Sequence, residues 1–151
     1  MSFDQTKDVL NHARKFHQKL SEFYEELKES ASKERTRALL DYLSRHEKYL
    51  DENLASFEEE VSDHVRDTYF RYGSEEGRVA QISEFAIKPE MDVDDVVQAA
   101  MHFDACLIRF YKEMAQHAVS SRVREVFENL LVMEQQEQME LSKQVIGLGS
   151  L

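Results

Sequence analysis

No glycine or proline precedes Gly73 in this chain of 151 residues, which contains only 4 glycines and 1 proline in total. Sandwiches and barrels of short strands need such residues in turns at regular spacing, so the sequence argues against an all-β fold. The fold class that remains is one of long helices joined by few connections. We therefore predict an all-α protein, and the length predicts a single domain over residues 1–151.

Charge and hydropathy exclude several classes of partner. The chain has 19 Lys and Arg against 30 Asp and Glu, a net charge of −11 that attracts cations and disfavours nucleic acid and anionic membranes. Cys106 is the single cysteine, which excludes an internal disulfide, a CxxC redox pair and a four-cysteine metal module. Mean hydropathy is −0.59, and no apolar run reaches the roughly 18–20 residues of a membrane span. The first residues do not resemble a secretory signal, so a cytoplasmic location is expected.

Apolar residues that recur with a period of about 3.6 residues predict four amphipathic helices. These helices are expected at residues 4–30, 32–61, 92–118 and 121–146. A capping box formed by Ser2 and Gln5 is expected at the start of the first helix. Asp92 is the expected N-cap of the third helix, and Gly147 is expected to end the fourth. Because only a few residues separate the helices of each pair, we expect two antiparallel hairpins.

Residues 62–91 join the two hairpins and form a much longer segment than a bundle turn needs. The segment contains an aromatic cluster formed by Tyr69, Phe70 and Tyr72. We expect a crossover between the hairpins whose aromatic residues cover one end of the bundle. A homodimer surface is the alternative interpretation.

Ionisable residues interrupt the apolar stripe of every expected helix. Glu134 and Glu137 continue the 3–4 spacing of the apolar residues around them in the fourth helix, so both carboxylates are expected to point into the bundle. Glu47, Asp104 and His17 hold similar positions in the second, third and first helices. Isolated buried carboxylates would cost several kcal/mol each or stay protonated. A bound cation solves this problem, and oxygen ligands with one imidazole suit iron or manganese.

An internal repeat relates the two halves of the chain at an offset of 87 residues. His17 and Asp104, Glu47 and Glu134, and Leu50 and Glu137 are each separated by this offset. The same offset pairs Leu20 with Leu107, Leu43 with Leu130, Leu54 with Leu141, Phe23-Tyr24 with Phe110-Tyr111, and Ala31 with Ala118. The chain is therefore predicted to use one helical hairpin twice, with pseudo-twofold symmetry about the expected site.

Phe-Tyr-Glu-Glu at residues 23–26, Phe-Tyr-Lys-Glu at residues 110–113 and the acidic centres of the second and fourth helices resemble the ferritin-like superfamily. The rubrerythrin-like di-iron carboxylate proteins are the most similar members, and the resemblance covers residues 9–145. It implies a ferritin-like antiparallel four-helix bundle of two helical hairpins joined by a long crossover. It also implies two metal ions, held by a Glu from each of two helices and a Glu-x-x-His from each of the other two.

The resemblance also implies a role for each candidate residue. The single-Glu positions fall on His17 and Asp104, and Glu47 and Glu134 become the bridging pair. The histidines of the two Glu-x-x-His motifs are replaced by Leu50 and Glu137. The resemblance further implies that Tyr24 and Tyr111 lie beside the ligands and donate hydrogen bonds to them.

The departures from the family pattern predict a degenerate centre. Leu50 cannot bind a metal, so the half shared by His17 and Glu47 has lost a ligand. The acidic half keeps enough ligands for one ion, from the third and fourth helices with Glu47 bridging. His46 lies beside Glu47 but at the flank of the apolar stripe, next to two tyrosines, and is not expected to bind the ion.

Two functions of different classes follow from this pattern. The first is a metal-binding protein that holds iron, as one or two ions, with manganese and zinc as alternatives, and reacts with oxygen or peroxide. Because the chain lacks a four-cysteine iron site, its electrons would come from an external electron-transfer protein. The second is a non-catalytic helical bundle for interaction or stress sensing, in which the acidic centre is a vestigial, hydrogen-bonded layer and His17 an ordinary core residue.

Overall fold

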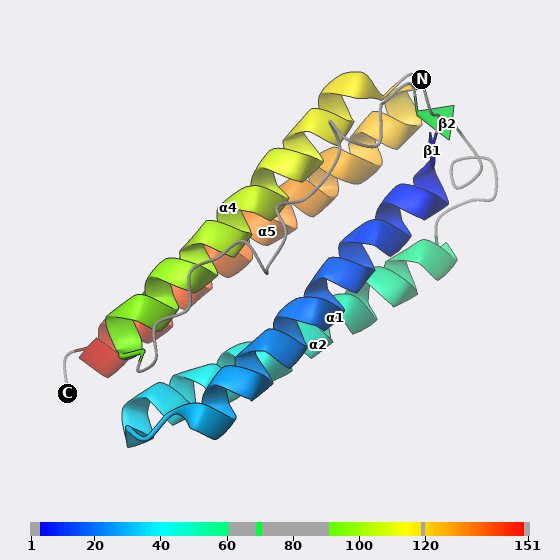
Figure 1. Cartoon of the computed structure of the whole chain (residues 1–151). Helices are drawn as coiled ribbons and strands as arrows, with labels where there is room; N and C mark the ends of the chain where they lie inside the picture. Colours follow the sequence, from blue (N-terminus) through cyan, green and yellow to red (C-terminus); the bar gives the residue numbers. More distant parts are fainter. Residues whose placement is uncertain (1–3, 61–68, 71–90, 119, 150–151) are drawn as a thin grey trace.

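The computed structural model describes residues 4–60, 69–70, 91–118 and 120–149. Four long helices make up most of this described part and form a four-helix bundle, as predicted (Figure 1). They are α1 (Thr6–Ser30), α2 (Glu34–Glu60), α4 (Val93–His117) and α5 (Ser121–Gly149). None of these helices has an apolar stretch that could cross a membrane.

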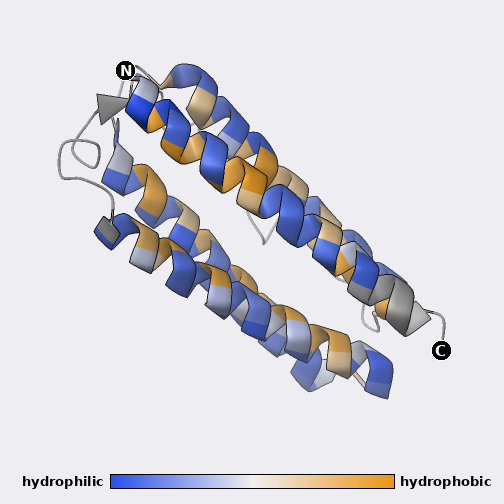
Figure 2. Cartoon of the chain, turned by 180° about the vertical axis from the view of Figure 1, so that it is seen from behind, coloured by the Kyte–Doolittle hydropathy of each residue, from blue (hydrophilic) through white to orange (hydrophobic). Residues whose placement is uncertain are grey.

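The helices form two antiparallel hairpins, α1 with α2 and α4 with α5. The colours of Figure 1 show that α2 and α4 run in the same direction, opposite to α1 and α5. Aromatic rings join the two hairpins, since the ring of Phe103 in α4 meets those of Phe16 and Phe23 in α1 edge-on at 6.2 and 5.7 Å. Figure 2 shows hydrophobic and hydrophilic residues alternating along each helix, as amphipathic helices require.

The N-terminal end of α1 differs from the prediction. Residues Asp4–Gln5 form strand β1, which pairs antiparallel with strand β2, Tyr69–Phe70. Because these residues are extended, α1 begins at Thr6 rather than at residue 4, and the expected capping box at Ser2 and Gln5 is wrong. Gln5 is instead the N-cap, and its backbone N–H donates to the Asp8 carboxylate at 3.1 Å.

Of the expected crossover at 62–91, the structure describes Tyr69–Phe70 and Met91. The two aromatic residues lie in strand β2, beside the start of α1 and so at one end of the bundle (Figure 1). The rest of the expected crossover, including Tyr72, lies outside the described residues.

Two further boundaries correct the sequence analysis. Helix α2 begins at Glu34 instead of residue 32, because the Lys33 carbonyl accepts the first helical hydrogen bond, from the Arg37 N–H at 3.0 Å. Helix α5 continues through Gly147 and ends at Gly149, so the expectation that Gly147 ends it is wrong. A glycine ends a helix by adopting a left-handed conformation, and no glycine in the described ranges has a positive φ.

The repeat is confirmed in the backbone. Helices α1 and α4 are both 25 residues long, and their first and last residues are separated by the same offset of 87 residues. Their C-caps use the same hydrogen bond, from Ala31 N–H to the Lys28 carbonyl at 3.3 Å and from Ala118 N–H to the Ala115 carbonyl at 3.4 Å. Asp92 caps α4 as predicted and accepts a hydrogen bond from its third helical residue. The two hairpins are therefore built alike.

The core is apolar above and below a polar layer in the middle of the bundle. The leucines and aromatic residues that the repeat aligns are buried in it. At the start of α4, Val96 is fully buried, whereas Val93 and Val97 are half-buried beside the core.

Candidate metal centre

His17 is the central residue of the polar layer. Its imidazole is completely buried in the middle of α1 and lies between two glutamates from different helices. The Nδ1 atom is 2.5 Å from Oε2 of Glu47 in α2, and the Nε2 atom is 3.3 Å from Oε1 of Glu134 in α5. Glu47 and Glu134 are themselves only 3% and 1% exposed. The layer thus joins the two hairpins through one imidazole.

The two glutamates keep His17 positively charged. Burial by itself would lower the pKa of His17, because a low-dielectric interior disfavours the imidazolium. The charge of Glu47, together with hydrogen bonding and charge from Glu134, outweighs burial and raises the pKa of His17 from 6.5 to about 10. At neutral pH the layer therefore contains one imidazolium shared by two carboxylates.

Asp104 brings α4, the remaining helix, to the same layer. Burial raises its pKa well above 3.8, and the charges of Glu47 and Glu134 raise it further. The positive charge of His17 acts in the opposite direction but does not reverse the shift. Asp104 is therefore close enough to interact electrostatically with His17, Glu47 and Glu134. It competes with the two glutamates for the positive charge of His17.

Glu137 does not join this group. It is half-buried, and its Oε2 atom lies 2.9 Å from Nε2 of His46, at the side of the bundle where α2 meets α5. The flanking position of His46 is confirmed, but its contact with Glu137 was not predicted. The spacing of Tyr42, His46 and Tyr49 along one side of α2 was the available signal, because it places two rings beside the imidazole.

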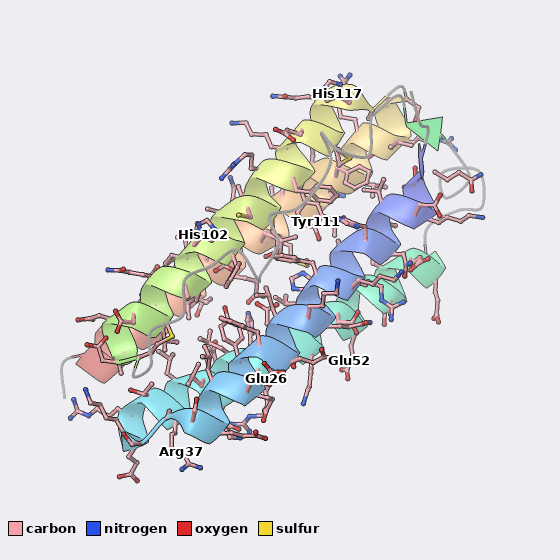
Figure 3. All side chains as sticks on the ribbon, viewed as in Figure 1. Glu26, Arg37, Glu52, His102, Tyr111 and His117 are labelled. Carbon is pink, nitrogen blue, oxygen red and sulfur yellow. The ribbon has the colours of Figure 1, made fainter. Side chains whose placement is uncertain are left out.

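Two tyrosines lie against the layer, one from each repeat. Burial raises the pKa of Tyr24 well above 10.0, followed by the charges of Glu47 and Asp104. Burial also raises the pKa of Tyr111, followed by the charges of Glu134 and Glu47. Figure 3 shows Tyr111 between the two hairpins, and within the described structure its hydroxyl has no hydrogen-bond partner. Both rings keep water away from the carboxylates.

Two serines that the sequence analysis missed hold α1 against α2 at this height. Ser21 Oγ donates to the carbonyl oxygen of Ser44 at 3.1 Å, and Ser44 Oγ donates to the carbonyl oxygen of Ser21 at 3.2 Å. Ser21 follows His17 by one helical turn, and Ser44 precedes Glu47 by one turn. Their small side chains let the two helices approach closely, which explains why His17 and Glu47 touch directly.

The layer contains polar atoms that are not satisfied. His17 Nε2 and Glu134 Oε1 are both buried, and beyond their ion pair at 3.3 Å neither has a hydrogen-bond partner among the described residues. Leu50 is buried on α2, one turn after Glu47, and offers no polar atom. As the side chains lie in the described structure, no three His, Cys, Asp or Glu residues are placed to hold one ion together. His17 thus contacts Glu47 and Glu134, Asp104 is within electrostatic range of all three, and Glu137 stays at the edge.

No family model, curated protein or solved structure matches the chain. The function of the layer therefore has to be inferred from its own geometry.

Proposed function

We propose that the chain is a metal-binding, ferritin-like protein of the rubrerythrin-like type, which holds its ion in the polar layer. The observation that carries the proposal is the pair His17 Nε2 and Glu134 Oε1, which face each other at 3.3 Å in the buried centre and have no further hydrogen-bond partner among the described residues. A buried polar atom without a partner costs about 1–3 kcal/mol. A cation that bound both atoms would satisfy them and would have to replace the proton on His17 Nε2, because a protonated ring nitrogen has no lone pair for a metal.

The charge of the layer supports the same conclusion. A single imidazolium faces the carboxyl groups of Glu47, Asp104 and Glu134, so the acidic groups exceed the positive charge available. Three carboxyl groups and one imidazole form a donor set that suits iron or manganese, with zinc as an alternative. In this proposal Glu47 and Glu134 would be the bridging pair of ligands, as the resemblance implies, while Asp104 and His17 would bind from the remaining two helices.

The arrangement of the helices supports the ferritin-like assignment. Helices α2 and α4 run in the same direction, as they do when a long crossover joins two hairpins. The repeat of 87 residues, with matching ends in α1 and α4, supports a twofold arrangement of ligands about one centre.

Bound iron would supply the oxidation–reduction chemistry that the side chains lack, with oxygen or peroxide as the oxidant and an external protein as the electron donor. The chain itself orients the carboxylates and excludes water. Tyr24, Tyr111 and Phe103 are at most 1% exposed and enclose the layer in apolar surface. Such a dry centre strengthens the attraction between a cation and the glutamates.

The second candidate function is a metal-free bundle for interaction or stress sensing. The position of His17 favours it, because its imidazolium already compensates part of the charge of Glu47 and Glu134. In this case the polar layer fixes the register of the hairpins. Both candidates share the fold and differ in the metal content of the protein.

Metal analysis separates the two candidates. We expect protein produced with iron to contain about one ion per chain, and the double variant Glu134→Ala/Glu137→Ala to contain almost none. The matched control is Glu125→Ala/Glu128→Ala, which removes two exposed glutamates with the same spacing from the same helix. Chelator should lower the melting temperature of the parent protein, because a bound ion at about 100 times its Kd stabilises by about 2.7 kcal/mol.

Two results would contradict the metal-binding proposal. One is a parent protein that contains almost no metal and melts at the same temperature in chelator. The other is a metal content that falls as much in the control variant as in the double variant at Glu134 and Glu137. The first result would favour the metal-free bundle.

Leu50→His tests the repeat alignment. This substitution restores an imidazole at the position that the offset pairs with Glu137, one turn after Glu47. We expect the metal content to rise from about one ion per chain toward two, because the half of the centre at α1 and α2 regains a ligand. Leu54→His, one turn further along the buried side of α2, is the control and should leave the content unchanged. A folded Leu50→His variant without added metal would contradict the alignment.

A further inference from the structure

His46 lies between two tyrosine rings at the side of the bundle. Its ring stacks on Tyr42, with centroids 5.6 Å apart and an angle of 10° between the planes, and on Tyr49 at 6.4 Å and 27°. Two rings on the same helix thus fix the orientation of the imidazole, with Nε2 2.9 Å from the Glu137 carboxylate on α5. His46 is therefore placed to control where Glu137 points.

Glu137 lies between the buried layer and the surface. Burial raises the pKa of Asp104 in the layer and of Tyr42 at the side of the bundle, and the charge of Glu137 raises both further. Its side chain is 26% exposed, whereas Glu134, one turn earlier on α5, is 1% exposed. A change of rotamer would move the Glu137 carboxylate from His46 toward Glu134 and Asp104.

Which position Glu137 prefers depends on the charge in the layer. Without a cation, an inward Glu137 would add another carboxylate to a group that already has too little positive charge, and repulsion would oppose the move. The outward position avoids this repulsion and gains a contact with His46. A divalent cation bound to Glu134 and Asp104 would reverse the balance, because it attracts one more carboxylate.

We propose that His46 is a positioning residue that holds Glu137 at the edge of the metal-free bundle, and that Glu137 leaves His46 and turns inward when the centre binds its ion. This inference rests on the proposed metal-binding function. It adds that one ligand, Glu137, has a second position, in contact with His46, that competes with metal binding. His46 lowers the apparent affinity for the metal, since only the inward state of Glu137 contributes to binding.

Zn²⁺ is a suitable probe, because it is diamagnetic and permits both titration and NMR. We expect His46→Leu to bind Zn²⁺ about threefold to tenfold more tightly than the parent protein, since Glu137 loses its competing partner. His46→Gln keeps a donor at this position and should bind within about twofold of the parent affinity. His117→Leu makes the same change at the far end of α4, as labelled in Figure 3, and should have no effect.

A spectroscopic readout separates positioning from a merely structural role. The imidazole ¹⁵N signals of His46 should shift when the parent protein is saturated with Zn²⁺. In Glu137→Gln the signals of the metal-free protein should already differ from those of the parent, because the carboxylate contact is lost.

The outcomes distinguish the inference from the proposed function. Unchanged Zn²⁺ affinity in His46→Leu, or unchanged His46 signals on saturation, would overturn the inference while the metal-binding function stands, provided that Glu134→Ala abolishes binding. Absence of Zn²⁺ binding in the parent and in every variant would overturn the proposed function and the inference together.

Discussion

Replacing His17 with alanine is expected to lower the free energy of unfolding of the metal-free protein by about 3–5 kcal/mol. The imidazolium is completely buried and lies between the carboxylates of Glu47 and Glu134. Its removal leaves two buried carboxylates without the positive charge that lies between them, besides a cavity of the size of the ring. Urea denaturation of chelator-treated protein, followed by circular dichroism, measures the loss.

His12→Ala is the matched control for this measurement. It removes an exposed imidazole from the same helix, and we expect a change within about 0.5 kcal/mol. A loss below about 1 kcal/mol in His17→Ala would contradict the account, since it would mean that His17 carries no charge that the glutamates need.

Stability of the metal-free protein should fall as the pH rises from about 6.5 to about 10. His17 has a higher pKa in the folded protein than in the unfolded chain, so the folded state holds the proton more tightly. The contribution of His17 to the free energy of unfolding is complete below pH 6.5 and is lost as the pH rises through about 10. The slope reaches at most about 1.4 kcal/mol per pH unit, which makes the total several kcal/mol.

Two variants identify the source of this slope. His17→Gln should remove most of it, because glutamine does not titrate. Burial raises the pKa of Asp104, so Asp104 acts with the same sign from about pH 3.8 upward, and Asp104→Asn removes whatever part of the slope it contributes. Measurements at about pH 7–9 avoid the ionisation of tyrosines in the unfolded chain. An unchanged slope in His17→Gln would contradict the assignment of the charge to His17.

The repeat explains how much could be predicted from the sequence. Its offset of 87 residues predicted two equivalent hairpins, and the matching ends and caps of α1 and α4 confirm them. Spacing within the apolar stripes placed His17, Glu47 and Glu134 in the interior, and all three are buried. These predictions succeeded because they depend on helical periodicity, which is local.

The contacts between hairpins could not be predicted in the same way. Spacing alone placed Glu137 inside, but it does not reveal that His46 on another helix offers a partner at the edge, 2.9 Å away. Ser21 and Ser44 were missed because they interrupt the repeat. The equivalent positions in the second hairpin are Ile108 and Leu131, so no symmetry pointed to the serines.

Helix ends were predicted less well than helix centres, for a physical reason. The start of α1 depends on the pairing of Asp4 and Gln5 with a strand that is distant in sequence, which no local motif signals. Gly147 was expected to end α5, yet glycine is tolerated within a helix at a cost of about 1 kcal/mol.

X-ray diffraction from crystals of protein produced with iron, recorded at the iron absorption edge, tests the central claim most directly. We expect an anomalous peak in the buried layer beside the carboxylates of Glu47, Asp104 and Glu134, with Glu137 turned toward it. A layer without such a peak, in which the His17 imidazole still lies between Glu47 and Glu134, would contradict the account.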